Sequence, residues 1–82
     1  MPPYKELFPK GSRVRVRSRD VLLEFQRTWR FHDPLSDEML PFAEHAATVS
    51  SLGYYHGGDV LYWLDGVPGT WHEVCLEAFS GM

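Results

Sequence analysis

Strict alternation of polar and apolar residues over positions 12–17 predicts the first strand of the chain. Val14 and Val16 would face a core, while the arginines between and beside them would face outward. The preceding Lys10-Gly11 pair is typical of a turn. The strand therefore has one buried and one exposed face.

The next segment changes to helical spacing, which predicts a short helix over residues 19–27, inserted after the first strand. Ser18 or Asp20 would cap its start. Three consecutive apolar residues near that start would also suit an extended segment. The residues at helical spacing are Val21, Leu22, Phe25 and Trp29.

Residues 29–41 follow without a clear period, with a turn at 33–34 and one helical turn that Pro41 would end. Beyond them, short β-prone runs alternate with turns, and residues 65–69 join two runs as a hairpin. A tight helical turn is expected at 74–76. The further predicted strands are residues 45–51, 60–64, 70–73 and 77–79. Strands separated by turns, without long helices between them, indicate an all-β domain.

The chain has 82 residues, enough for one domain with one modest core. Hydrophobic residues make up 44% of it and aromatic residues 15%, which excludes a disordered chain. Residues 1–9 contain three prolines and no period, so we expect a loosely ordered arm before a domain over 10–82. No apolar run suits a membrane span or a signal peptide. The single cysteine, Cys75, fits a reducing compartment, so we expect a cytoplasmic protein.

This order of elements resembles that of an SH3-like barrel. The segments that carry the resemblance are KGSRVRV at 10–16, AATV at 46–49, VLYWL at 60–64, TWHE at 70–73 and VCLEA at 74–78. The chain is similar, more narrowly, to small barrels that serve as accessory subunits, such as the variable chain of ferredoxin–thioredoxin reductase and the barrel part of the nitrile hydratase β subunit. Those barrels are also bracketed by an opening G-x-x-V-R-V and a closing L-E.

The resemblance implies a small all-β SH3-like barrel of about five strands with a short helix after the first strand. Two features depart from it. Glu44 and His45 stand where many such barrels have glycines before the second strand. The aromatic and proline set of the peptide-binding members is not matched either, so recognition of proline-rich ligands is not implied.

Charge is divided unevenly along the chain, although its net value is only −3. The first thirty residues hold all eight basic side chains and three acidic ones, whereas residues 31–82 hold eight acidic side chains and no Lys or Arg. A barrel would set the first strand beside the last strands, where its arginines would pair with Glu73 and Glu77. The alternative is a nucleic-acid-binding strand, which the net negative charge disfavours. Its residues would be Arg13, Arg15, Arg17 and Arg19.

Side chains that could carry chemistry are few. His45, His72 and Cys75 could in principle hold a metal, but structural zinc sites usually need two ligand pairs and only the last two residues form one. Glu73 and Glu77 beside Cys75 would raise its thiol pKa, so a small core residue fits better than a nucleophile. We therefore expect no cofactor, no metal and no enzymatic activity.

A surplus of aromatic rings is the strongest functional signal. The strand at 60–64 is apolar on both faces, so either the helix at 19–27 lies over Trp63 or a partner covers that face. Exposed rings on loops are typical anchors of interfaces. The sequence therefore predicts a non-catalytic protein-interaction module or accessory subunit with a protein partner. The candidate partner-binding residues are Trp29, Phe31, His32, Tyr54, Tyr55, His56 and Trp63.

Overall fold

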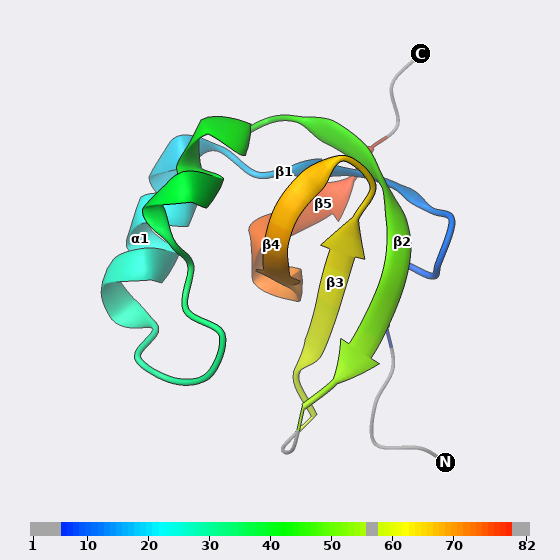
Figure 1. Cartoon of the computed structure of the whole chain (residues 1–82). Helices are drawn as coiled ribbons and strands as arrows, with labels where there is room; N and C mark the ends of the chain where they lie inside the picture. The colour runs from blue at the N-terminus through cyan, green and yellow to red at the C-terminus, as the bar shows by residue number, and fades with distance from the viewer. Residues whose placement is uncertain (1–5, 56–57, 80–82) are drawn as a thin grey trace.

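A computed structural model of the chain describes residues 6–55 and 58–79. The chain begins with strand β1 (Arg13–Val16) and helix α1 (Arg19–Thr28), followed by the 3₁₀-helix η1 (Asp37–Phe42). Strands β2 (Ala46–Tyr54), β3 (Val60–Leu64) and β4 (Val67–His72) come next. The 3₁₀-helix η2 (Glu73–Cys75) leads into strand β5 (Leu76–Ala78) (Figure 1).

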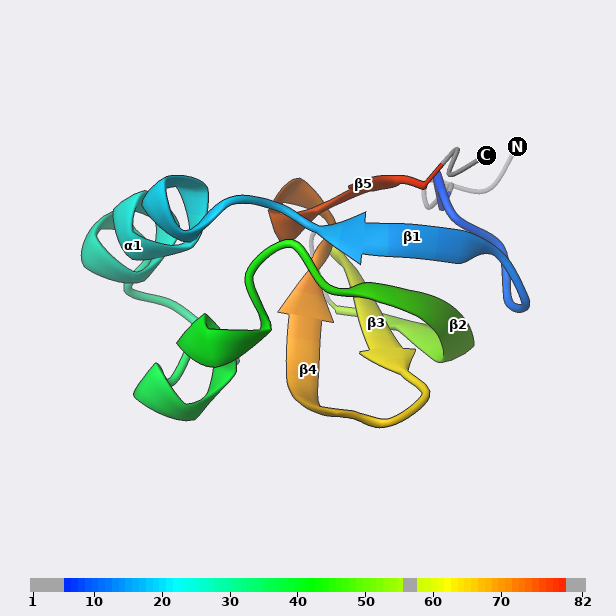
Figure 2. The same ribbon diagram turned by 90° about the horizontal axis from the view of Figure 1, so that it is seen from above.

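The five strands form one antiparallel sheet in the order β4-β3-β2-β1-β5. Strand β2 pairs with β1 through its first half and with β3 through its second half. The register shifts between Val49 and Ser51, close to the point where β2 changes from one partner strand to the other. Such a bulge bends a strand and increases its twist. The sheet is therefore strongly curved, with β1 and β5 turned over β3 and β4 (Figure 2).

The prediction of a closed barrel is wrong. Within the described residues the ladder ends at β4 on one side and at β5 on the other, so the sheet is open. Strand β5 has only three residues, all paired with β1, and η2 separates it from β4. Pro68 in β4 lacks a backbone N–H, which suits an edge position.

The predicted elements are all present, with some boundaries moved. Strand β4 begins at Val67 rather than at 70, because Asp65 and Gly66 alone make the turn, with Gly66 at φ +75°. Strand β2 continues past 51 to Tyr54. Pro41 lies inside η1 and does not end it.

The core lies on the inner side of the curved sheet. Val14 and Val16 are fully buried, as their alternation predicts. Helix α1 contributes Leu22, and η1 contributes Met39 and Leu40. Within the predicted arm, residues 6–9 are described, and Phe8 packs against the Tyr62 ring at 5.7 Å.

Helix α1 begins at Ser18, whose side chain accepts a hydrogen bond from the backbone N–H of Val21. The helix packs against η1 and η2 at one end of the sheet (Figures 1 and 2). Of the two alternatives for Trp63, cover by this helix is not realised, since Trp63 stays 38% exposed. None of the helices in the described ranges has the length and apolar character needed to cross a bilayer.

Candidate protein-interaction site

Aromatic rings gather where the end of α1 meets β4 and the β2–β3 connection. Trp29, the residue after α1, is at the centre of this group. Its ring centroid lies 4.9–5.4 Å from those of four neighbours. We call the group the ring cluster, and its members are Phe25, Trp29, Phe31, His32, Tyr55 and His72.

His32 fastens the loop after α1 to the β2–β3 connection. Its ring stacks on Tyr55 with centroids 3.5 Å apart and planes inclined by 11°. Its Nε2 lies 2.9 Å from Asp59 Oδ2 and its Nδ1 lies 3.1 Å from Asp33 Oδ2. An imidazolium can donate to both carboxylates, whereas neutral imidazole has one proton for two acceptors. The hydrogen bond to Asp59 therefore raises the pKa of His32, with a smaller contribution from Asp33.

His72 connects the same loop to β4. It is 5% exposed, and its Nε2 lies 2.9 Å from the carbonyl oxygen of Asp33. Because a carbonyl oxygen only accepts, Nε2 of His72 carries a proton. Asp33 has φ +48°, a left-handed conformation that Asp tolerates better than most residues. The loop after α1 is thus attached to the rest of the fold at two points, by His32 to Asp59 and by the carbonyl oxygen of Asp33 to His72.

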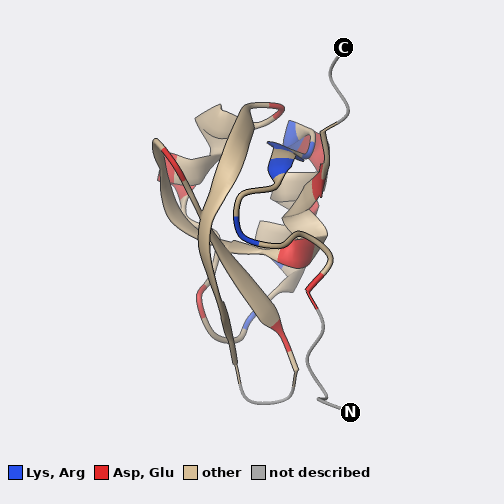
Figure 3. Cartoon of the chain, turned by 90° about the vertical axis from the view of Figure 1, so that its right-hand side faces the viewer, with Lys and Arg blue, Asp and Glu red and all other residues tan. Residues whose placement is uncertain are grey.

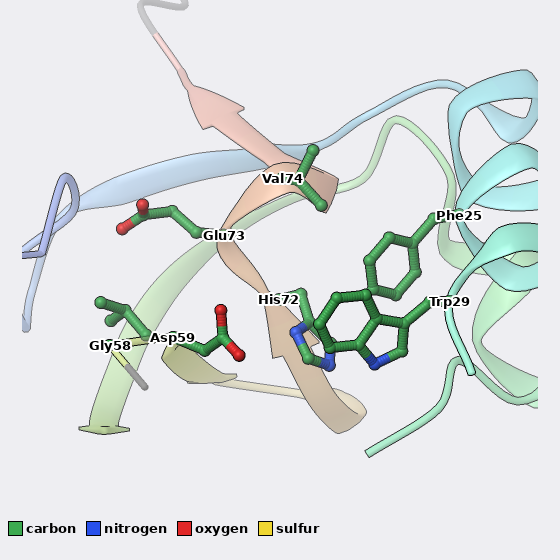
Figure 4. A pocket seen from close by; sticks show the side chains of 8 residues that line it. Phe25, Trp29, Gly58, Asp59, His72, Glu73 and Val74 are labelled. Carbon is green, nitrogen blue, oxygen red and sulfur yellow. The ribbon is translucent and has the colours of Figure 1, made fainter. Parts of the chain in front are cut away.

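A pocket of about 300 Å³ opens beside the ring cluster. Phe25 reaches it from α1 and Trp29 from the residue after that helix, and Asp59 and Glu73 lie on the other side of His72 (Figure 4). We call it the aromatic pocket. The residues that line it are Phe25, Trp29, Gly58, Asp59, Val60, His72, Glu73 and Val74.

A second hollow, of about 350 Å³, runs along α1. We call it the helix groove. Its wall is mostly hydrocarbon from the helix, and Val74 of η2, 51% exposed, closes its far side. The lining residues are Asp20, Val21, Glu24, Phe25, Thr28 and Val74. Phe25 and Val74 line both hollows, which therefore adjoin each other.

Glu73 does not pair with an arginine as predicted. Its Oε2 accepts hydrogen bonds from the hydroxyl of Tyr62 and from the backbone N–H of Leu7, the latter at 3.1 Å. Burial, with a smaller contribution from the Glu73 carboxylate, raises the pKa of Tyr62 well above its usual range. A neutral phenol therefore holds Glu73 at the edge of the aromatic pocket.

The structure brings together four of the predicted partner-binding residues, namely Trp29, Phe31, His32 and Tyr55. Tyr54 donates its hydroxyl to Glu6, at 2.8 Å, and Trp63 belongs to the outer face of β3. His56 lies outside the described residues.

Phe25, Asp59, Glu73 and Val74 are site residues that the sequence analysis did not select. The i, i+4 spacing of Phe25 and Trp29 places both on one helix face and could have found the first of them. Asp59 and the adjacent pair Glu73 and Val74 are far from Phe25 in the sequence and meet it only in the fold.

The predicted basic strand has partners within the protein. Arg15 forms an ion pair with Glu77 at 2.9 Å, as its position opposite the last strand predicts. Arg13 donates to Thr48 and lies over the ring of Phe79. Arg17 donates to the carbonyl oxygen of Val74 at 3.2 Å. Between residues 46 and 72, by contrast, the only charged residues of the sequence are two acidic ones, Asp59 and Asp65, and Figure 3 shows no blue on strands β2 to β4.

Cys75 is fully buried, and burial raises the pKa of its thiol to about 12. A thiol of that pKa is almost entirely protonated at neutral pH and is a weak nucleophile. Within residues 6–55 and 58–79, no three His, Cys, Asp or Glu side chains come together as a metal site. His45, proposed above as a third ligand, instead packs edge-on against Phe42.

Compared with models of protein families, with curated proteins and with solved structures, the chain shows no significant match.

Proposed function

We propose that this protein is a non-catalytic interaction module and that a segment of a partner protein docks in the helix groove and the aromatic pocket. The observation that carries the proposal is the adjacency of the two hollows, which share Phe25 and Val74. Together they offer hollows of about 300 and 350 Å³, room for more than one side chain. A partner would cover Val74, an apolar side chain left half exposed on a short 3₁₀-helix.

Hydrogen bonds within the protein also fix the elements that form the walls of the site. Gln26 of α1 donates to the carbonyl oxygen of Leu35 at 3.1 Å and to Asp37 at 2.8 Å, which ties the helix to the start of η1. His32 and His72 hold the loop between them. A recess whose walls are fixed before binding loses less conformational entropy when a partner docks.

The resemblance to accessory-subunit barrels supports the same reading. The short helical turn before the last strand, one of the features that carry the resemblance, corresponds to η2, and η2 provides Val74 and Glu73 to the site. An accessory subunit acts by contact with another chain, so an apolar recess on this turn suits that role.

Selection of random dodecapeptides displayed on phage, with the full chain immobilised, tests the proposal. We expect enriched peptides that bind the wild-type chain and lose at least tenfold in affinity on Val74→Asp, because a charge would then stand in the apolar recess. Val67→Asp is unsuitable as a control because Val67 packs against the core, so Ala78→Asp, an exposed position on β5, is used instead. Enrichment of no peptide, or equal losses on both variants, would refute the docking site.

A further inference from the structure

We propose that the aromatic pocket receives a lysine or arginine side chain of the docking segment, while an apolar side chain of the same segment occupies the helix groove. This inference rests on the proposed function and adds the chemical class of the ligand. The observation that carries it is one recess lined by two aromatic side chains, Phe25 and Trp29, on one side of His72 and by two acidic residues, Asp59 and Glu73, on the other (Figure 4).

Charge within the pocket has one sign. Asp59 and Glu73 line it, and none of its eight lining residues is Lys or Arg. Hydrogen bonds from the described residues reach only Oδ2 of Asp59 and only Oε2 of Glu73. The Asp59 side chain is 45% exposed and therefore accessible to a ligand.

His32 does not cancel this charge. When it is protonated, its positive charge lies between two carboxylates, Asp33 and Asp59, at 3.1 and 2.9 Å. The three groups together then keep one negative charge, to which Glu73 adds a second. When His32 is neutral, the local charge is more negative still. The pocket is thus anionic in both states, which favours a cationic group and disfavours an acidic one.

The aromatic walls of the pocket suit the hydrocarbon stem of a lysine or arginine side chain. Lysine and arginine place a hydrocarbon stem before their charge, and such stems lie along apolar surface while the charged group stays near water or a carboxylate. Phe25 and Trp29 supply that surface, and aromatic faces also attract cations. A volume of about 300 Å³ admits one such side chain.

The adjoining helix groove defines the second position. Val21, Phe25 and Val74 give it an apolar wall, and none of its six lining residues is Lys or Arg. Of the arginines nearby, Arg27 is paired with Glu24 at 2.6 Å and Arg17 donates to the carbonyl oxygen of Val74 at 3.2 Å. A segment with a basic residue close to an apolar one would therefore fill both hollows, with Phe25 and Val74 between the two side chains.

Titration of the ¹⁵N-labelled full chain with N-acetyl-lysine methylamide tests the pocket alone. The reporter is the Trp29 indole N–H, which donates to the carbonyl oxygen of His32 at 2.8 Å. We expect saturable shifts with the lysine probe and with its arginine analogue, and at least threefold weaker binding of the norleucine analogue, which lacks the charge. Asp59→Asn and Glu73→Gln should each weaken binding of the lysine probe about twofold to fivefold, the size of one partly exposed charge pair.

The matched control is Asp65→Asn, which removes an exposed carboxylate in the β3–β4 turn and should change affinity less than twofold. Glu73→Gln keeps an oxygen acceptor for Tyr62 and serves if Asp59→Asn disturbs the fold. Equal binding of the lysine and norleucine probes would overturn the inference, as would equal losses on Asp65→Asn and Glu73→Gln.

Failure of this inference is distinguishable from failure of the docking site. Phage-selected peptides that depend on Val74 but contain no enriched Lys or Arg, and that bind Glu73→Gln unchanged, would leave the docking site intact and refute the cationic pocket. Absence of any Val74-dependent peptide would refute the docking site, while the lysine titration would still decide whether the pocket takes a cation.

Discussion

Two charged regions of this small sheet differ in how their charges are used. On β1, the arginines stand on the outer face of the strand and meet partners on the neighbouring strands, such as Glu77 on β5 and Thr48 on β2. At the aromatic pocket, Asp59 and Glu73 border a recess between elements that are distant in sequence. Side chains on the face of a sheet lie close to those directly opposite on the neighbouring strands and pair with them. A recess instead leaves room for a ligand beside its charged groups.

The comparison predicts that removing a ring of the cluster lowers stability and probe binding more than removing any one surface charge. Trp29→Ala removes the centre of the ring cluster, so we expect the free energy of unfolding to fall by about 2–3 kcal/mol, below the cost for a fully buried Trp because Trp29 is half buried. Binding of the lysine probe should disappear. Chemical denaturation measures the first effect, and the NMR titration measures the second through shifts of the Gly58 and Val74 amides.

Phe31→Ala is the matched control, since Phe31 touches Trp29 but is 70% exposed. It should cost less than about 1 kcal/mol, in the range of surface substitutions. Equal losses for the two variants would mean that Trp29 does not organise the site.

A smaller effect is expected from His32, and its sign follows from its carboxylate partners. The folded state raises the pKa of His32 above its unfolded value, with Asp59 the largest cause. The stability that it contributes is therefore complete below the unfolded pKa, about 6.5, and is lost as pH rises through the folded pKa. As the pH rises above about 6.5, we therefore expect the melting temperature to fall more steeply for wild type than for His32→Gln.

His45→Gln is the control for that measurement, because His45 is exposed and contacts the Phe42 ring rather than a carboxylate in the described residues. Its pH profile should follow that of wild type. A His32→Gln profile that also follows wild type would show that the contacts with Asp33 and Asp59 do not bind the proton more tightly in the folded protein.

Protonation of His32 should also weaken binding in the aromatic pocket. It adds a positive charge 2.9 Å from Asp59, and the groups that face this ring are Asp33, Asp59, Tyr55, Trp29 and His72. We therefore expect the lysine probe to bind more tightly at pH 8 than at pH 6, and His32→Gln to reduce this difference. A probe that binds more tightly at pH 6 would contradict the charge assignment of the pocket.

The strands and the helix could be predicted from the sequence because the spacing of apolar residues along a segment reflects which face of that segment is buried. Val14 and Val16 alternate with arginines and are buried, and the helical spacing of Leu22 and Phe25 places both toward the core. Boundaries moved where pairing decides them: Val67 joins β4 because it pairs with Leu64 across a two-residue turn.

Closure of the sheet and the composition of the site could not be predicted in that way. Whether β5 meets β4 depends on where η2 directs the chain, which no local period records. Asp59 follows a glycine pair and Glu73 follows a strand, and each position is equally typical of a solvated turn residue. The approach of α1 to η2 brings Glu73 to the aromatic pocket, and the contact of His32 with Asp59 brings the β2–β3 connection to it.

The smallest effect is expected on β1, and it bears directly on the other side of the comparison. Arg15 and Glu77 are 44% and 41% exposed, so Arg15→Ala should change the free energy of unfolding by no more than about 1 kcal/mol. If β1 instead bound nucleic acid, a fluorescent 20-nucleotide oligothymidine would bind wild type with an affinity that falls steeply with salt, and Arg15→Ala would reduce that slope. We expect no such binding at 50 mM salt, because Arg13, Arg15 and Arg17 already have partners and the chain carries a net charge of −3. A steep salt dependence that Arg15→Ala lessens would show that the basic outer face of β1, and not only the recess, is a binding surface.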